Sequence, residues 1–536
     1  MAPTVRVIVP LLDMAAKKRA VLERAGLPDV FENVGADADG DLLGEMVAAF
    51  RVAALSHHEW YFLPLDGLDT RLRAAEYVST RNERLALGAL KRIFRENGVP
   101  VPRALVAMCT AFIAPQCKPC LARPVDAIRN ENFASLGPTR KMHLADVAMG
   151  SAQEPEAGFD PEMGLGVVLD EPVAENELCV SVPRDRVIDI RTALASETMG
   201  PILAELRDEA IVDHDDTIVM LFVLSEKLRG DASPWAAYFS LIPAEFYTTL
   251  TFSDDELALL ETTPLAQETA AALERLREHY DALFPALSER YASVFPAAEY
   301  TWANFLWVRV LFDTRAMEIT VDGKAQTVLV PLADMMNHEA LGQISSYQYE
   351  AATDSIVFRA FGDVPPGCHL CLHYGSVPTE RRLLYYGFLE PDATEDSIML
   401  DLEMPDFDDP MEATLKGLLV ERLDLGAPHF VGRAEPAERL RAFLRIINLT
   451  PAELAAHAEP LLNGSRSAAT PCSDESEEAV SSMMRSFADI VDMFPTSVDE
   501  DAQLLAAPEA LTVRARLAIQ YRMAFKEMLL KLRRLA

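Results

Sequence analysis

Three short segments in the middle of the chain decide the fold. They are Pro331-Leu332-Ala333-Asp334-Met335-Met336-Asn337-His338, the pair Tyr374-Gly375, and Leu383-Leu384-Tyr385-Tyr386-Gly387-Phe388. An Asn-His pair by itself is typical of a turn with a hydrogen-bonded histidine. The three segments in this order and at these separations are hard to obtain from a generic β domain, so they indicate a specific functional site.

Two weaker segments come earlier in the chain. The first is Glu162-Met163-Gly164-Leu165-Gly166-Val167-Val168, and the second is Ser233-Pro234-Trp235-Ala236-Ala237-Tyr238, with Ile242-Pro243 beyond it. A Gly-x-Gly turn is common by chance, and Leu169 stands where a dinucleotide-binding fingerprint would have its third glycine. These segments therefore add weight only in combination with the later ones.

Taken together, the segments resemble the SET methyltransferase group typified by the plant Rubisco large-subunit lysine methyltransferase. The resemblance covers residues 155–390 and extends more loosely into the C-terminal helical region, which is a substrate-binding domain in that family. It implies an α+β fold with a SET-type β core, a helical insert and all-α flanking domains. It also implies S-adenosylmethionine as the cofactor and a side-chain nitrogen of another, non-histone protein as the methyl acceptor.

The resemblance assigns roles to individual residues. Tyr374 is the expected catalytic residue, with a hydroxyl that orients the methyl group and the incoming nitrogen rather than acting as a strong base. Glycine allows close approach of the backbone to a cofactor, and the fork of donors on Arg315 suits the cofactor's carboxylate. The expected cofactor-binding residues are Gly164, Leu165, Gly166, Arg315, Asn337, His338 and Phe388.

A narrow substrate channel is implied as well. Tyr349, Tyr386 and Met317 match channel positions, where aromatic faces favour an alkylammonium stem. Met317 is apolar, as in lysine-methylating relatives, whereas the histidine-methylating branch that resembles the actin enzyme carries Asn there. Phe388 leaves room beside the acceptor nitrogen, which favours di- or trimethylation.

Three departures from the family pattern concern cofactor affinity. Met163 stands where Glu is common, His373 where a small or polar residue is usual, and Thr379 where Asn is usual. Two alternatives to a lysine methyltransferase therefore stay open: a catalytically decayed SET scaffold that binds a protein partner, and a protein-histidine methyltransferase.

The domain organisation follows from composition and periodicity. Strand-like segments at 167–169, 178–182, 327–330 and 355–358 flank a long helical stretch, and the Ser- and acid-rich segment 465–478 reads as a solvated loop. We predict a helical module at 1–115, a linker at 116–154, a SET domain at 155–390 with its helical insert at about 190–305, and a helical substrate-binding domain at 391–536.

The two ends of the chain resemble each other. Lys18, Glu23, Arg24 and Leu27 match Lys416, Glu421, Arg422 and Leu425, each pair 398 positions apart (421 − 23). Arg51, Leu55, Ser56, Glu59 and Glu83 match Arg445, Leu449, Thr450, Glu453 and Glu477, each pair 394 apart (445 − 51). Either the helical module is partly duplicated, or two amphipathic helical segments share these residues by chance.

Composition limits the partners and the compartment. The net charge of −34 disfavours nucleic-acid binding and fits either a basic protein partner or solubility alone. The seven cysteines are too few for a disulfide framework, and neither Cys117-x-x-Cys120 nor Cys368-x-x-Cys371 has a second pair at zinc spacing. We expect no metal, no membrane span and a cytoplasmic location, with nucleus or organelle still open; the oligomeric state is not indicated.

Overall fold

The structure is a computed structural model that divides the chain into two compact units. The first unit comprises Met1–Ala86, Tyr247–Ala270 and Ser376–Ala536, and the second comprises Leu87–Phe246 and Ala271–Gly375. The described residues are 3–11, 14–63, 72, 79–113, 121–124, 127–138, 140–148, 165–212, 214–321, 323–339, 342, 344–375, 377–390, 397–400, 402–432, 437–507 and 511–536.

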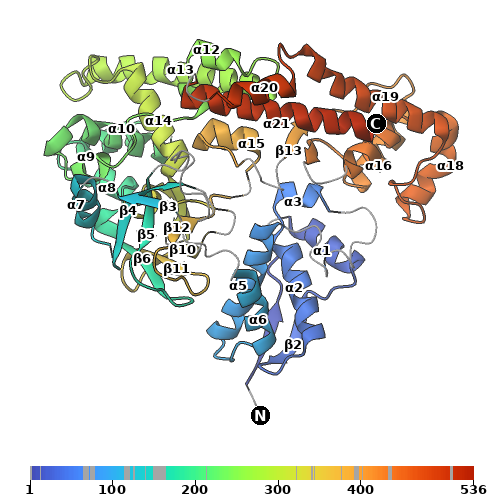
Figure 1. The fold of residues 1–536 in the computed structure, drawn as a ribbon, viewed down its shortest axis with the longest axis horizontal. Helices are drawn as coiled ribbons and strands as arrows, with labels where there is room; N and C mark the ends of the chain where they lie inside the picture. Colours follow the sequence, from blue (N-terminus) through green and yellow to red (C-terminus); the bar gives the residue numbers. More distant parts are fainter. Residues whose placement is uncertain are drawn as a thin grey trace. The chain divides into compact units, whose positions relative to one another are not determined.

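Small sheets form the core of the second unit (Figure 1). A five-stranded sheet has the order β3-β4-β5-β12-β9, a three-stranded sheet has the order β10-β11-β6, and β7 pairs with β8. The strands are β3 (Leu121–Pro124), β4 (Met142–Ala148), β5 (Leu165–Leu169), β6 (Leu178–Pro183), β7 (Met317–Val321), β8 (Lys324–Val328), β9 (Asn337–His338), β10 (Ile344–Glu350), β11 (Ser355–Ala360) and β12 (His369–Leu372).

Helices interrupt this β core between β6 and β7. The helix α14 (Trp302–Arg315) begins at a Thr301 side chain that accepts a hydrogen bond from the Asn304 amide, as N-caps do. The other helices of the second unit are α6 (Arg103–Ile113), α7 (Ala127–Ser135), α8 (Ile190–Leu194), α9 (Gly200–Asp208), α10 (Asp215–Leu228) and α11 (Ala236–Phe239). Two helices, α5 (Thr80–Glu96) and α13 (Pro264–Arg290), start in the first unit and end in the second.

The first unit is mainly helical and holds two antiparallel strand pairs, β1 (Thr4–Ile8) with β2 (Val30–Gly35) and β13 (Ser397–Leu400) with β14 (His429–Gly432). Its helices are α1 (Ala15–Arg24), α2 (Gly40–Ala54), α3 (His57–Tyr61), α12 (Asp254–Ala258), α15 (Thr379–Arg381), the π-helix η5 (Arg382–Tyr386), α16 (Pro410–Arg422), α17 (Glu438–Ile447), α18 (Pro451–Leu462), α19 (Asp474–Ala488), α20 (Val498–Leu505) and α21 (Val513–Leu535).

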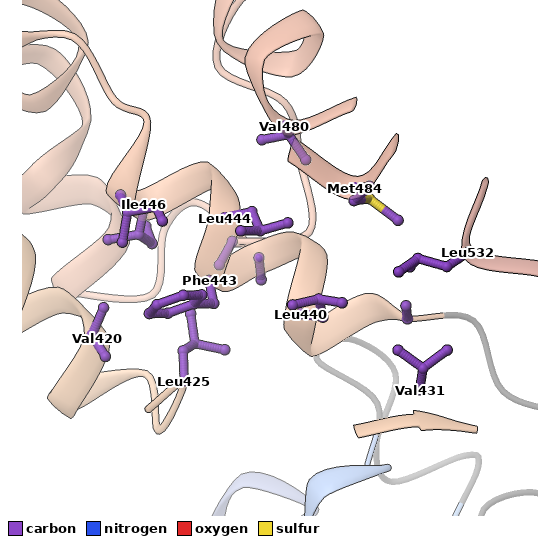
Figure 2. Close-up of a cluster of buried hydrophobic side chains, with 14 of the residues drawn as sticks. Val420, Leu425, Val431, Leu440, Phe443, Leu444, Ile446, Val480, Met484 and Leu532 are labelled. Carbon is purple, nitrogen blue, oxygen red and sulfur yellow. The ribbon is translucent and has the colours of Figure 1, made fainter. Parts of the chain in front are cut away.

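A hydrophobic cluster joins the C-terminal helices. Figure 2 shows Leu440, Phe443 and Leu444 of α17 among side chains from neighbouring elements, with Met484 from α19 and Leu532 from α21. These side chains are fully or almost fully buried. Burial of this kind stabilises by about 25 cal/mol per Å² of apolar surface, so it holds the C-terminal helices in one compact domain.

The sequence-based expectations are only partly met by the elements. The α+β class and the strands β5, β6, β8 and β11 are confirmed. The stretch 116–154 was expected to be a linker, but β3 and β4 lie there and extend the sheet through β5. The module at 1–115 was expected to be helical and also contains the β1–β2 pair.

The solvated loop expected at 465–478 is shorter than predicted. Helix α19 begins at Asp474, where Ser473 accepts a hydrogen bond from the Ser476 amide and acidic residues fill the first turn. Acidic residues at a helix N-terminus are stabilising, so the composition that suggested a loop is also that of a helix start.

Cys117 and Cys120 lie outside the described residues.

Candidate active site

Strand β12 organises the site within the second unit. All four of its residues are buried between β5 on one side and β9 on the other. β9 runs parallel to β12, with Asn337 opposite Cys371 and His338 opposite Leu372. This pairing places the Asn337-His338 dipeptide at a fixed position beside the start of β5.

Asn337 is held from two directions. Its side-chain amide donates to the backbone oxygen of Leu165 (3.1 Å) and lies 3.3 Å from Nε2 of His369. Burial lowers the pKa of His369 to about 4, so the ring is neutral at ordinary pH. Because Nε2 accepts from the Asn337 amide, the ring proton belongs on Nδ1, which lies 3.3 Å from the Cys371 sulfur.

Tyr374 is fixed at both its backbone and its hydroxyl. Its amide donates to Nδ1 of His338 (3.0 Å), and its hydroxyl donates to the backbone oxygen of Met336 (2.7 Å). The His338 and Tyr374 rings lie 5.2 Å apart between centroids. Since the hydroxyl proton is directed at Met336, the Tyr374 oxygen can serve any further partner only as an acceptor.

Arg315 lies at the end of α14 and contacts the turn before Asn337. Its Nη1 donates to the backbone oxygen of Asp334 (2.6 Å). Its Nε and Nη2 make no hydrogen bond to any residue that the structure describes. The guanidinium therefore retains donors for an anionic ligand.

Asp334 is a buried carboxyl group that receives the Tyr238 hydroxyl as a hydrogen-bond donor. Burial raises the pKa of Asp334 to about 6, although the Arg315 charge opposes the shift. Burial and the Asp334 charge also raise the pKa of Tyr238. The Oδ1 atom of Asp334 has no hydrogen-bond partner among the described residues.

Leu332 stores strain just before this turn. Its φ of 80° is in the region that residues with a side chain rarely adopt, yet the residue is buried. Such strain costs on the order of 1–3 kcal/mol and persists where the surrounding structure enforces it. The strained φ of Leu332 is consistent with a turn whose shape is set by the position of the segment 334–338 and not by the lowest local energy.

The remaining predicted residues of the second unit have other contacts. Tyr349 on β10 donates its hydroxyl to Asp354 (2.9 Å), and the Arg184 guanidinium lies 5.6 Å from its ring centre. These contacts tie Tyr349 to the β10–β11 turn, so its channel role stays a prediction. Met317 begins β7 directly after α14, and the His373 ring accepts from the Gly375 amide (3.0 Å).

Tyr386, Phe388 and Thr379 belong to the first unit. The Tyr386 and Phe388 rings lie 6.2 Å apart between centroids. The Thr379 hydroxyl, at the position where Asn is usual, is buried and has no hydrogen-bond partner among the described residues. Gly164 and Met163 lie outside the described residues, whereas Leu165 and Gly166 begin β5.

The chain was compared with known proteins. Residues 411–529 match the family model for Rubisco LSMT substrate-binding. The chain is 26% identical over 385 residues to the actin-histidine N-methyltransferase of Mus musculus, which covers 69% of this chain and 63% of the mouse protein. It is 24% identical over 444 residues to the chloroplastic [fructose-bisphosphate aldolase]-lysine N-methyltransferase of Arabidopsis thaliana, which covers 80% of this chain and 88% of that protein.

Solved structures share the fold. Rubisco LSMT bound to sinefungin and monomethyllysine matches with a TM-score of 0.57 and 22% identity, over 76% of this chain and 91% of that one. Rubisco LSMT bound to AdoMet matches with a TM-score of 0.55 and 23% identity, over 76% of this chain and 90% of that one. The chain is homologous to SET-domain methyltransferases.

Two features of this site were missed by sequence reasoning. One is the Tyr238–Asp334 hydrogen bond, which links the segment Ser233–Tyr238 to the segment Pro331–His338. The other is His369, which contacts Asn337 from β12. Both motifs containing Tyr238 and Asp334 were identified, so a buried Tyr and a buried Asp could have been paired. His369 carried no signal.

Two features are absent from the residues that the structure describes. No group of three or more His, Cys, Asp or Glu side chains could hold a metal ion there. No helix in the described part is long and apolar enough to cross a membrane.

Proposed function

We propose that this protein is an S-adenosylmethionine-dependent protein N-methyltransferase with a lysine side chain as its acceptor. The observation that carries the proposal is the fixed position of Tyr374. Its amide donates a hydrogen bond to His338, and its hydroxyl donates one to the Met336 carbonyl. The substrate-binding match at residues 411–529 supports a protein as the acceptor.

The donor set of the second unit fits the cofactor. Arg315 retains guanidinium donors for the cofactor's carboxylate, and Asn337 is held at the start of β5 beside the backbone of Leu165. Gly166 is the next residue of that strand. Arg315, Asn337, His338, Leu165 and Gly166 would hold the cofactor, which supplies a methyl group on a sulfonium.

The residues of the chain would act mainly by positioning. Methyl transfer is an in-line displacement, so the acceptor nitrogen must be held in a fixed direction and must be neutral. The Tyr374 oxygen, with its proton directed at Met336, can accept a hydrogen bond from the acceptor nitrogen and orient it. Little acid–base chemistry is required of the protein.

Methyl transfer into a host extract tests the proposal. Radiolabelled cofactor should label a protein band with the wild-type chain, and Tyr374→Phe should reduce the rate by about a hundredfold or more. Tyr347→Phe removes a partly exposed hydroxyl from the same unit and should leave the rate unchanged. Equal labelling by wild type and Tyr374→Phe would defeat the assignment.

Histidine is the second candidate acceptor, because the chain is 26% identical to an actin-histidine N-methyltransferase over 385 residues. Met317 favours lysine, since an apolar side chain offers an imidazole no hydrogen bond. Mass spectrometry of the labelled protein distinguishes methyl-lysine from methyl-histidine. It also tests the expectation of di- or trimethylation, which a purely monomethylated product would contradict.

A non-catalytic scaffold is the third possibility. A scaffold keeps the fold but does not need the cofactor, so calorimetry separates it from an enzyme: absence of S-adenosylmethionine binding would favour the scaffold.

For the methyltransferase, we further propose a basic protein partner and a cytoplasmic location, with nucleus or organelle as alternatives. A cellular fractionation would test the location.

A further inference from the structure

Two segments that lie mainly in the first unit share the same order of labelled elements within the described residues. The first runs β1-α1-β2-α2-α3-α5, and the second runs β13-α16-β14-α17-α18-α19. In both segments the two strands pair antiparallel with one helix between them. The family-model match at residues 411–529 begins in α16, so the second segment lies largely within the substrate-binding domain.

The turn after the first helix is the same in both segments. Gly26 and Asp424, 398 positions apart (424 − 26), both have positive φ, 62° and 53°. The amide that follows each of them bonds back five residues, from Leu27 to the Leu22 oxygen and from Leu425 to the Val420 oxygen. This is one left-handed helix end, made once with glycine and once with aspartate.

A buried lysine occupies the same place in each segment. Lys18 donates to the backbone oxygen of Ala53 (2.7 Å). Lys416 donates to the backbone oxygen of Ile447 (2.8 Å). Their side chains are almost fully buried, which is rare for lysine, and each lysine joins the first helix to the end of the second.

An Arg–Glu pair is repeated at the later offset of 394 (445 − 51). Arg51 Nη2 donates to Glu83 Oε1 (2.8 Å). Arg445 Nη2 donates to Glu477 Oε1 (2.9 Å). A second guanidinium nitrogen, Nη1, also donates to a backbone oxygen in each segment, that of Leu72 for Arg51 and that of Ala469 for Arg445.

The third helices begin alike. Ser56 and Glu59 form a capping box at α3, and Thr450 and Glu453 form one at α18, again 394 positions apart (450 − 56). Such boxes are common, but the same box beside the same Arg–Glu pair and the same buried lysine is not expected by chance.

The change of offset from 398 to 394 has a structural explanation. The N-caps of α2 and α17, Asp39 and Ala437, still differ by 398 (437 − 39). Helix α2 has 15 residues and α17 has 10. Four of the five extra residues account for the change of offset (398 − 394) and add about one helical turn, which rotates the buried face only slightly. The fifth is Ala54, which corresponds to Asn448, the C-cap of α17.

We infer that residues 3–86 are a second copy of the module at 397–480, and that this copy binds the substrate-binding domain at the turn around Asp424. The surface around Asp424 is therefore covered by residues 3–86 and is not available to a protein substrate. The inference rests on contacts within the first unit and does not depend on the proposed activity.

The contact between the copies centres on Asp424. Its carboxylate accepts hydrogen bonds from the Trp60 indole and from Lys17 (2.7 Å) of copy one, while its backbone oxygen accepts from Arg439 (2.8 Å) of its own copy. An aspartate in a left-handed turn is less favourable than a glycine there. The two side-chain hydrogen bonds explain why copy two keeps aspartate.

Aromatic rings extend the contact onto β14. The Tyr61 ring meets Phe430 at 5.1 Å and His429 at 6.1 Å between centroids, edge to face. Phe62 lies 6.3 Å from Phe430. Copy one thus contributes a run of three aromatic residues, and copy two contributes the surface that receives them.

The contact is not reciprocal, because each copy contributes residues that the other copy lacks. The positions of copy two that correspond to Trp60 and Tyr61 are Leu454 and Ala455, which carry no aromatic ring. The position of copy one that corresponds to Asp424 is Gly26, which carries no carboxylate. Each half of the contact therefore exists on one copy alone.

Hydrogen exchange of the full chain tests the contact. Asp424→Gly installs the residue that copy one has at the same turn, so the turn should persist while the contact weakens. The α3 amides and the β14 amides should both exchange about tenfold faster, as expected for a lost charge-assisted hydrogen bond. Trp60→Phe keeps the ring, removes the indole donor and should give the same pattern.

The control is Gly26→Asp, which places the same side chain at the matching turn of copy one, where an added Cβ meets no described heavy atom within 4 Å. It should leave α3 exchange unchanged. The double variant Trp60→Phe/Asp424→Gly should exchange no faster than Asp424→Gly alone. Unchanged α3 exchange in both single variants, or additive effects in the double variant, would overturn the contact.

Superposition of the two copies in a crystal structure of the full chain tests the duplication itself. Superposing residues 3–63 and 79–86 on the matching part of 397–480 should bring Lys18 onto Lys416 and Arg51 onto Arg445. A different helix order, or lysines that bind different elements, would overturn the inference.

Discussion

Side-chain pairs at the residue scale, more than single residues, define the candidate site. Asn337 is useful to a ligand only if its amide keeps one orientation, and His369 helps to fix that orientation from the neighbouring strand. Tyr374 likewise depends on His338 and Met336. Groups that orient a ligand-binding residue often matter nearly as much as that residue itself.

His369→Leu should weaken S-adenosylmethionine binding by about tenfold, because one amide hydrogen of Asn337 loses its acceptor in a buried place. Calorimetry on the full chain measures the change. His369→Gln can present an oxygen to the same amide and should recover most of the affinity. Equal affinity of His369→Leu and wild type would contradict the role given to His369.

Asp334 should make stability depend on pH in an unusual direction. Burial raises its pKa from 3.8 to about 6, so between these values the folded chain binds one more proton than the unfolded chain. Its contribution to stability is therefore largest below about pH 4 and is lost as the pH rises through about 6.

The pKa of His369, lowered from 6.5 to about 4, acts in the opposite sense over nearly the same range, because here the unfolded chain binds the extra proton. Asp334→Asn should remove one of the two opposing slopes. Thermal denaturation from pH 4 to 6.5 should then show the variant gaining stability relative to wild type as the pH rises. A constant difference across this range would contradict the assignment.

At the element scale, Gly387 illustrates a turn that admits no side chain. It has a φ of 79°, and an added Cβ would lie 2.8 Å from the backbone nitrogen of Thr248. The atoms that the added Cβ would meet, in Tyr247 and Thr248, are backbone atoms, which cannot move aside easily. The glycine of the Tyr-Gly-Phe segment thus has a packing reason, independent of any ligand.

Gly387→Ala should lower the free energy of unfolding by about 1–3 kcal/mol, through the disfavoured φ and the backbone clash. Gly417→Ala in α16 is the matched control, since an added Cβ there meets only the Met404 methyl at 4.0 Å. It should raise stability by about 0.5–1 kcal/mol, because alanine favours the helix. Urea denaturation of both variants measures the difference, and equal effects would refute the close approach.

Sequence reasoning predicted the elements whose pattern is local. β6 and β11 were predicted from the strand-like segments 178–182 and 355–358. β3 was missed because Leu121–Pro124 is short and contains Arg and Pro, and only pairing with β4 makes it a strand. The Tyr238–Asp334 bond was missed because it joins residues 96 positions apart, which no local pattern reports.

At the scale of the whole molecule, charge is the dominant feature. Acidic residues outnumber basic ones by 83 to 49. A field of one sign raises the rate of encounter with a partner of the opposite sign and is screened by salt. Charge therefore bears on how fast a basic protein would arrive and not on the transfer step.

Methylation of a basic protein substrate should slow as salt is raised. At limiting substrate, kcat/KM should fall severalfold between about 50 and 500 mM salt, while kcat at saturation changes little. Labelling of extract proteins at several salt concentrations measures this. Insensitivity of kcat/KM to salt would favour an acid excess that serves solubility alone.

The contact at Asp424 also bears on how separate copies of this protein could associate. A head-to-tail joint between repeated units can continue indefinitely into a filament unless its ends are blocked. Here Gly26 removes the joint's acceptor at one end and Leu454 removes its aromatic donor at the other. Gly26→Asp alone would supply the missing acceptor but should not make the protein polymerise, because Leu454 lies buried in the hydrophobic cluster and offers no donor.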